Sequence, residues 1–549
     1  MTSRLIALFV AAVAAAACTA PPAGTSAEAP AATAPAAGDD AASRWFAHVE
    51  FLADDDMRGR ETGSPEHRKA ADYVAGELER AGVEPAGIAG FMQPVTFRSR
   101  RIDESKSGLA LVRRGREVPV VLGDEATFSM RIDAAPQVEA PLVFAGHGLV
   151  IPELDHNDFA GLDVKGKVVV HLSGSPRNVP GALSAHYQSA AERWSALKRL
   201  GAIGTITIPN PKAMDVPWER SAPNRLNPSM ALADSSTDDT AGAQVSIAFN
   251  PAKAEKLFEG SGRTLAEMLK VADEGKALPH FPLAVSMKAT VAVDSQAVES
   301  QNVVGVVKGS DPELADEYVV LSAHLDHVGV GAAINGDSIY NGAMDNASGI
   351  ATLIESAKAV VAARPKRSVL FVAVTAEEKG LLGSRYFAIH PTVPKANLVA
   401  NINMDMFLPL FPMKSVMVLG LDESSLGDDI RTVAQGLGLT VQADPEPQRN
   451  RFIRSDQYSF IREGVPALAM KVGYEEGSPE ARIAADWTRE RYHGPADDLA
   501  QPIDRTAAVL FTDLTAKLCV QVANRAERPE WKAESFFRRF AKPAPDTTH

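Results

Sequence analysis

The chain alternates between two rhythms of apolar and polar positions. From residue 302 onward, short apolar runs rich in β-branched residues are followed by segments with the three- and four-residue spacing of a helix. The predicted strands are 302–307, 318–322, 368–375, 398–403, 415–419 and 465–471, and the predicted helices include 350–363, 424–436 and 505–524. This alternation predicts an α/β fold with a mixed, largely parallel central sheet and helices on both faces.

The region before residue 302 has a different texture. Residues 42–87 predict helical structure, because Ala70, Tyr73, Val74 and Leu78 share one helical face. Residues 91–130 alternate and predict short strands. From about residue 140 to 282 the order is strand, strand, helix, strand, which predicts an inserted β-rich α+β domain. The predicted segments are therefore 44–139 (first part of the main domain), 140–282 (insert), 283–525 (main domain) and 526–549 (tail).

The N-terminus predicts export. Residues 1–18 contain one arginine, an apolar run and small residues before Cys18, which is typical of a signal peptide. The run before Cys18 resembles the lipobox of bacterial lipoproteins, with Ala15 at the usual leucine position. Two outcomes stay open: a lipid anchor at Cys18 with a periplasmic, membrane-attached protein, or cleavage and secretion. Residues 19–43, rich in Ala and Pro, predict a flexible tether.

The composition and charge of the chain argue against nucleic acid as a partner. The 549 residues are 45% hydrophobic and 23% charged with a net charge of −13, which is typical of a globular protein and lacks the basic footprint of a nucleic-acid binder. The only other cysteine, Cys519, lies in an apolar helical pattern, so we expect it to be buried and unpaired. The sequence indicates no particular oligomeric state.

Histidine and acidic residues follow the predicted strands of the main domain. They come from five places along the chain: His324 and Asp326, Asp345, Glu377 and Glu378, Asp405, and His493. Ligands meet at the carboxyl ends of strands in such sheets, and clustered carboxylates would repel one another without cations. Mixed imidazole and carboxylate ligands suit Zn²⁺, with Mn²⁺ or Co²⁺ as alternatives. The pattern predicts a two-metal hydrolytic site.

The order of these motifs resembles a known family. H-x-D at 324–326, DNASG at 345–349, EE at 377–378, N-x-D at 403–405 and YH at 492–493 are similar to the co-catalytic zinc aminopeptidases, family twenty-eight of the metallopeptidases, which includes glutamate carboxypeptidase. The zinc exopeptidase fold and peptide substrates are implied by this resemblance. Residues 144–148, 163–167 and 198–202 resemble a protease-associated domain, which would be the insert.

The resemblance also implies individual roles. It makes His324 and Asp405 ligands of one metal, Asp345 the bridging ligand, and Glu378 and His493 ligands of the second. Among the catalytic group, it makes Glu377 the general base, Asp326 the carboxylate that orients the His324 imidazole, and Tyr492 a phenol that stabilises the tetrahedral intermediate. It leaves His327 without a metal, and it implies a cis peptide between Asp345 and Asn346.

Other functions remain open at the level of sequence. A single acid at a strand end is more often a solvated residue or a helix cap than a ligand. The most favoured function is an aminopeptidase. The alternatives are a glutamate-releasing carboxypeptidase, a glutaminyl-cyclase-like acyltransferase with one zinc, and a binding module without catalysis. The intact set of predicted ligands argues against the last.

Overall fold

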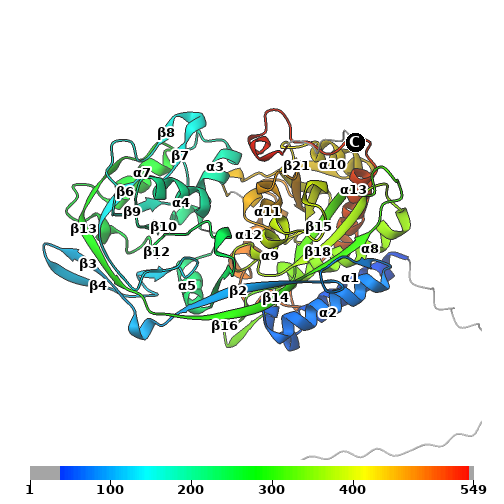
Figure 1. Ribbon diagram of the computed structural model, residues 1–549, viewed down its shortest axis with the longest axis horizontal. Helices are drawn as coiled ribbons and strands as arrows, with labels where there is room; N and C mark the ends of the chain where they lie inside the picture. The colour runs from blue at the N-terminus through cyan, green and yellow to red at the C-terminus, as the bar shows by residue number, and fades with distance from the viewer. Residues whose placement is uncertain (1–36, 215, 450, 543–549) are drawn as a thin grey trace, which may run out of the picture.

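The computed structural model describes residues 37–214, 216–449 and 451–542. It contains two lobes joined by the long strands β2 (Met92–Ile102) and β14 (Val293–Val307), which pair over the whole of β2 (Figure 1). The predicted signal peptide, Cys18 and most of the tether lie outside the described residues, so those predictions stay predictions. The tether was predicted too long, because α1 (Ala37–Leu52) already begins inside it.

The larger lobe is built on a sheet of ten strands. Its path is β11 (Ser229–Leu232), β2, β14, β18 (Ser368–Val374), β15 (Tyr318–His324), β19 (Leu398–Asn403), β22 (Ala467–Val472), β20 (Ser415–Leu419) and β21 (Thr440–Ala443), with β1 (Glu84–Pro85) paired to β14. The central strands β18, β15, β19 and β22 are parallel, whereas β14 and β20 flank them antiparallel. The mixed α/β sheet is thus confirmed, and its longest parallel run lies at the centre, with a further parallel pair, β20 and β21, at one edge.

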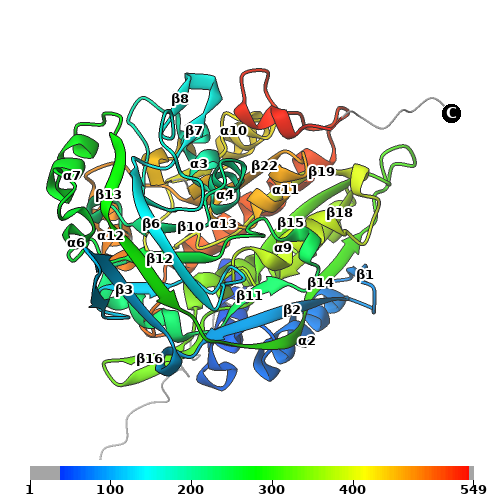
Figure 2. The same cartoon turned by 60° about the vertical axis from the view of Figure 1, so that its left-hand side comes forward.

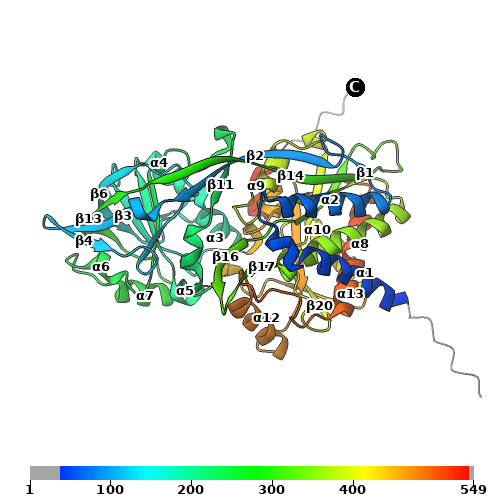
Figure 3. The same ribbon diagram turned by 90° about the horizontal axis from the view of Figure 1, so that it is seen from below.

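Helices cover both faces of this sheet, as predicted. One face packs against α1, α2 (Pro65–Arg80), α8 (Ser348–Ala363), α10 (Leu426–Gly436) and α13 (Arg505–Ala523) (Figure 3). The other packs against α9 (Leu382–Ile389) and α11 (Gln457–Arg462). Successive residues of a strand point to opposite faces, so Val319 joins the first core and Val320 the second.

The smaller lobe has its own sheet of eight strands. Its order is β4 (Arg116–Val120), β3 (Gly108–Arg113), β13 (His280–Thr290), β6 (Gln137–Ala145), β9 (Val168–Leu172), β10 (Gly204–Ile208), β12 (Val245–Phe249) and β5 (Ala126–Phe128). α6 (Glu255–Phe258) and α7 (Leu265–Asp273) cover one face and α4 (Ala190–Arg199) the other (Figure 2). We call this lobe the second-sheet domain.

The predicted boundaries of the insert, 140 and 282, need correction. The second sheet starts at Gly108 and ends at Thr290, and it takes β3 to β5 from the segment assigned to the main domain. Conversely, β11 lies within 140–282 but pairs with β2 in the first sheet. A short turn joins β2 to β3, and only residues 291–292 separate β13 from β14, so no change of composition marks the crossing between the two sheets.

Helix α13 closes the larger lobe. Its length and apolar composition would allow a membrane span, but Phe511, Leu514, Leu518 and Cys519 are fully buried between α8 and α10. Burial raises the pKa of the Cys519 thiol, and Cys519 is unpaired within the described residues. This agrees with an inert core position.

Candidate metal centre

The predicted ligands meet at the carboxyl ends of the parallel strands. β15 ends at His324, β18 is followed by Glu377 and Glu378, and β19 is followed by Asp405. Asp345 lies in the one-turn segment Ala343–Ala347 that leads into α8. His493 follows α12 (Pro479–Glu490). The sheet therefore brings together residues that are as much as 169 positions apart, from 324 to 493.

The carboxylate of Asp345 lies between two groups of ligands. Its Oδ1 is 3.1 Å from His324 Nε2, which is in turn 3.5 Å from Asp405 Oδ1. Its Oδ2 is 3.3 Å from His493 Nε2, which is 3.1 Å from Glu378 Oε2. Each oxygen of Asp345 thus faces a different histidine, as a bridging carboxylate requires.

His327 also belongs to this centre. The ring is fully buried, and Nδ1 lies 2.7 Å from Glu378 Oε1 and 3.9 Å from Asp345 Oδ2. Two sets of ligand atoms each lie within 4.8 Å of one another: His324, Asp345 and Asp405, and His327, Asp345 and Glu378. The resemblance gave His327 no role. The repeated histidine in His-Leu-Asp-His was the one sequence signal that could have indicated it.

These residues fit a metal ion. Among the described residues, His324 Nε2, Asp345 Oδ2, Glu378 Oε1 and Asp405 Oδ1 are buried without a hydrogen-bond partner. Buried polar atoms are rarely left unpaired, and these point into one small space. Two histidines with carboxylates form a donor set that suits zinc.

Charge coupling in the centre is strong. Burial lowers the pKa of His324, but the nearby carboxylates of Asp345 and Asp405 outweigh burial and raise the pKa well above its usual value. The pKa of His493 is likewise raised, against the effect of burial, by Glu378 and Asp345. Burial would raise the pKa of Asp345, but the nearby imidazoles of His324 and His493 hold it well below its usual value. The protonated imidazoles of His324 and His493 thus supply positive charge between the carboxylates.

Glu377 differs from its neighbour Glu378. Burial, together with nearby Glu378 and Asp405, raises the pKa of Glu377 well above its usual value. Histidine contacts hold the pKa of Glu378 far below its usual value despite its burial. Glu377 and Glu378 lie in the turn after β18, and their different surroundings shift the pKa values of the two carboxyl groups in opposite directions.

Asp326 acts differently from what the sequence suggested. His324 Nδ1 lies 3.0 Å from the main-chain oxygen of Asp326 instead of its carboxylate. The carboxylate accepts hydrogen bonds from Thr62 Oγ1 (3.0 Å) and from the main-chain N–H groups of Glu377 (3.0 Å) and Glu378 (3.4 Å). Asp326 therefore fixes the turn that carries both glutamates, and it orients the imidazole only through its backbone.

Two further residues shape the Asp345 turn. Asp497 is fully buried, and its carboxylate accepts from the N–H groups of Met344 (2.9 Å) and Asp345 (3.0 Å). The Asp345–Asn346 peptide is cis, as the resemblance implied. Asn346 donates from Nδ2 to Met404 O at 2.9 Å, which ties this turn to the segment before Asp405. The motif around His493 contained Asp497, but nothing in the sequence distinguished it from a solvated acid.

Arg60, in the N-terminal part of the larger lobe, holds the loop after β15 and the segment before Asp345 in place. Arg60 is fully buried and donates to the main-chain oxygens of Leu325 (3.0 Å), Asn341 (2.7 Å) and Gly342 (3.1 Å). Burial lowers its pKa to about 10, so the guanidinium stays charged. This accounts for an arginine whose role could not be read from the sequence.

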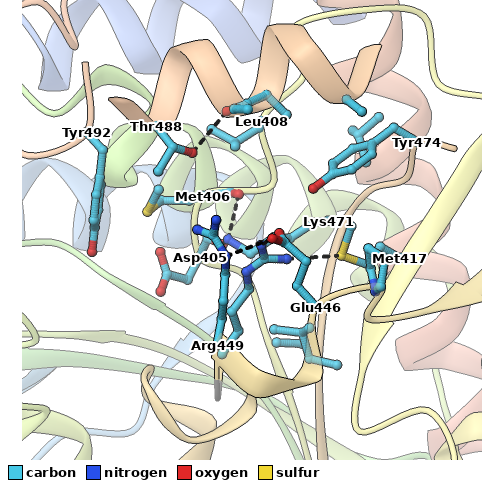
Figure 4. Close-up of a pocket in the computed structure, with 18 of the residues that line it drawn as sticks. Asp405, Met406, Leu408, Met417, Glu446, Arg449, Lys471, Tyr474, Thr488 and Tyr492 are labelled. Atoms are coloured by element: carbon cyan, nitrogen blue, oxygen red, sulfur yellow. Dashed lines mark hydrogen bonds and ion pairs between the residues drawn. The ribbon is translucent and has the colours of Figure 1, made fainter. Parts of the chain in front are cut away.

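A cavity of about 470 Å³ opens beside the centre. Asp405 and Tyr492 lie on one side of it, and apolar side chains such as Leu408, Met417 and Tyr474 form much of its wall (Figure 4). Tyr492 packs on His493 with ring centroids 3.9 Å apart. Lys471 donates to the main-chain oxygens of Asp405 (3.1 Å) and Met406 (3.0 Å), so it holds the Asp405 loop against the wall.

The mixed α/β sheet thus carries histidine and carboxylate side chains at the ends of its parallel strands, an arrangement that suits metal-ion binding. Residues 302–519 match the model of Peptidase family M28. The match confirms the resemblance drawn from the motifs.

Two curated relatives match part of this chain in sequence, and one solved structure matches most of it in fold. The chain is 29% identical over 271 residues to "Probable leucine aminopeptidase 2" of Aspergillus fumigatus, covering 46% of this chain and 50% of that protein. It is 27% identical over 261 residues to "Aminopeptidase Y" of Saccharomyces cerevisiae, covering 45% of each. The chain thus spans about half the length of these relatives. An aminopeptidase structure from Aneurinibacillus sp. strain AM-1 shares the fold, with a TM-score of 0.53 and 19% identity over 89% of this chain and 95% of that one.

Proposed function

We propose that the protein is a zinc-dependent aminopeptidase with two metal ions. The observation that carries this is the carboxylate of Asp345, whose two oxygens face His324 and His493 separately. His324 and Asp405 would hold one ion, and Glu378 with His493 the other. When bound, such a metal pair supplies an acidified water and polarises the scissile carbonyl.

Two residues beside the proposed metal ligands, Glu377 and Tyr492, would take part in the reaction. Glu377 is partly buried beside the proposed ligands with a raised pKa, so its carboxylate can accept a proton from water and return it to the leaving amine. The raised pKa makes Glu377 a better base than an exposed glutamate. Tyr492, between cavity and centre, can donate a hydrogen bond from its phenol to the developing oxyanion.

Peptides with a free N-terminus are the proposed substrates. Two observations support this: the relatives are named aminopeptidases, and the cavity beside Asp405 has largely apolar walls. Its volume of about 470 Å³ lies in the range of ordinary ligand pockets. We expect it to accept the side chain of the N-terminal residue and to favour large apolar ones.

One substrate screen tests this function. Zinc-loaded protein should hydrolyse aminoacyl substrates with a free amine, lose activity with a chelator, and regain it with Zn²⁺. Mn²⁺ and Co²⁺ are compared in the same assay. The same peptides acetylated at the N-terminus should be inert. Cleavage of the acetylated peptides from the carboxyl end would indicate a carboxypeptidase instead, and cyclisation of N-terminal Gln with one bound zinc would indicate an acyltransferase.

We also propose that the protein is exported, from the leader at 1–18. Labelled palmitate should enter the wild-type protein in a bacterial host and not the Cys18→Ser variant. Secretion of an unlabelled, shortened wild-type chain would instead support ordinary cleavage.

A further inference from the structure

The second-sheet domain reaches the metal centre through Arg220. This residue lies in α5 (Trp218–Ser221), on the side of the smaller lobe near α12 (Figure 3). Its Nη2 donates to Tyr492 O at 2.8 Å, and its Nη1 donates to Arg489 O. Arg489 is in the last turn of α12, where main-chain oxygens lack partners within the helix and attract cations. Arg220 therefore fixes the segment that leads into His493.

The turn at His493 needs such support. His493 has a φ of 50°, which is uncommon for a residue with a side chain. A Cβ atom placed on Gly494 would lie 3.2 Å from Arg220 Nη2, so the guanidinium packs closely on both sides of His493. Arg220 is itself well anchored, because Trp218 Nε1 donates to Gly123 O at 2.9 Å within the second-sheet domain.

A second arginine makes the corresponding contact to the other ligand. Arg131, in the loop between β5 and β6, donates from Nη2 to the main-chain oxygen of Glu378 at 3.3 Å. Arg220 and Arg131 thus act on His493 and Glu378, which are the two proposed non-bridging ligands of one metal ion. The ligands His324 and Asp405 are held by contacts within the larger lobe instead.

The two lobes also contact each other away from these arginines. Asp239 pairs with Arg462 at 2.6 Å, and His186 Nδ1 lies 3.2 Å from the Tyr458 hydroxyl. None of these four residues is next to a proposed ligand in the sequence. The two kinds of contact can therefore be tested separately.

We propose that the second-sheet domain completes the second metal site, with Arg220 and Arg131 as positioning residues for His493 and Glu378. This inference rests on the proposed two-metal function. Residues that orient metal ligands typically change metal affinity by about 10- to 100-fold when they are replaced.

Zinc titration of the full chain tests the proposal. Metal-free wild type, Arg220→Ala, Arg220→Lys and Arg131→Ala are titrated against a chromophoric chelator, and bound zinc is counted by mass spectrometry. We expect Arg220→Ala to bind the second zinc at least about tenfold more weakly with the first unchanged. Arg220→Lys should be intermediate, and Arg131→Ala should show a smaller loss because its hydrogen bond is longer. If circular dichroism shows that Arg220→Ala does not fold, the zinc affinities of Arg220→Lys and Arg131→Ala test the proposal instead.

Asp239→Asn is the matched control, because it weakens docking without touching a ligand segment. It should bind both zinc ions as the wild type does. Equal affinity in Arg220→Ala and wild type, equal losses in Asp239→Asn and Arg220→Ala, or one zinc in the wild type would each overturn the inference. A wild type that binds two zinc ions but cleaves no peptide would overturn the proposed function alone.

Discussion

At the scale of the residue, Glu377 and Glu378 show how one peptide turn separates two roles. Both are partly buried, but the charges of His493 and His327 act on Glu378, whereas those of His324, Glu378 and Asp405 act on Glu377. Asp326 binds both N–H groups and so prevents the pair from rotating. The roles can be separated by amide substitutions of the same size.

Glu377→Gln should keep two zinc ions and lose most turnover. The amide cannot accept the proton, and general base catalysis contributes about 10²- to 10⁴-fold. The measurement is kcat with an aminoacyl substrate, alongside zinc content. Glu378→Gln is the comparison variant and should lose zinc. Turnover within threefold of wild type in Glu377→Gln would assign the base elsewhere.

Asp345→Ala should reduce zinc at both positions, since each oxygen of this side chain faces a different ligand group. The metal-to-protein ratio after dialysis should fall from two to below one. Asp405→Ala, which lies near only one group, should lose a single ion. Two zinc ions retained in Asp345→Ala would exclude bridging.

The sequence predicted the proposed metal ligands better than the residues that hold the ligand loops in place. His324, Asp345, Glu378, Asp405 and His493 follow strands or a fixed motif, so their order alone brought them together. Asp326, Asp497 and Arg60 act through main-chain groups of loops, and those contacts depend on turn geometry that no spacing encodes. His327 was missed because one histidine in the motif already had a role.

At the scale of the element, the central strands and long helices were predictable and the crossings between lobes were not. β19 and β20 have the predicted bounds, and α13 ends one residue earlier than predicted. β2 and β14 carry the chain between the two lobes with little interruption of the strand pattern, however, so this pattern gives no boundary. The long helices matter to the site because they pack directly under its loops.

Phe511→Ala in α13 should destabilise the larger lobe strongly. Phe511 is fully buried and stacks on Phe407 with ring centroids 4.0 Å apart, two residues after Asp405. Removing a buried phenylalanine costs about 3–5 kcal/mol of unfolding free energy. Urea unfolding measures this. Lys517→Ala, on the exposed side of the same helix, should change it by less than about 0.5 kcal/mol. A loss below 1 kcal/mol in Phe511→Ala would contradict the packing argument.

At the scale of the whole molecule, the ligand cluster couples folding to metal and pH. Without zinc, the raised pKa values of His324 and His493 mean that the folded chain binds protons which the unfolded chain releases near a pKa of about 6.5. Their contribution to stability is fully present below that pH and is lost as pH rises through the folded values. Burial raises the pKa of Glu377 as well, and that of Asp456 to about 7, which acts in the same direction.

The metal-free protein should therefore become less stable relative to the zinc-loaded protein as pH rises from about 6 to 9. Zinc binds deprotonated histidine, so the loaded protein gains affinity over the same window in which the metal-free protein loses its bound protons. The measurement is Tm at matched pH with zinc and with chelator, and the difference between them cancels groups that titrate alike in both forms. His48 is buried away from the centre, beside Tyr73 and Glu355, and supplies the control variant His48→Gln. In this variant the Tm difference between zinc-loaded and metal-free protein should still increase with pH. A Tm difference that narrows with rising pH would mean that the histidines of the metal-free fold are neutral, and the charge assignment of the whole cluster would have to be reversed.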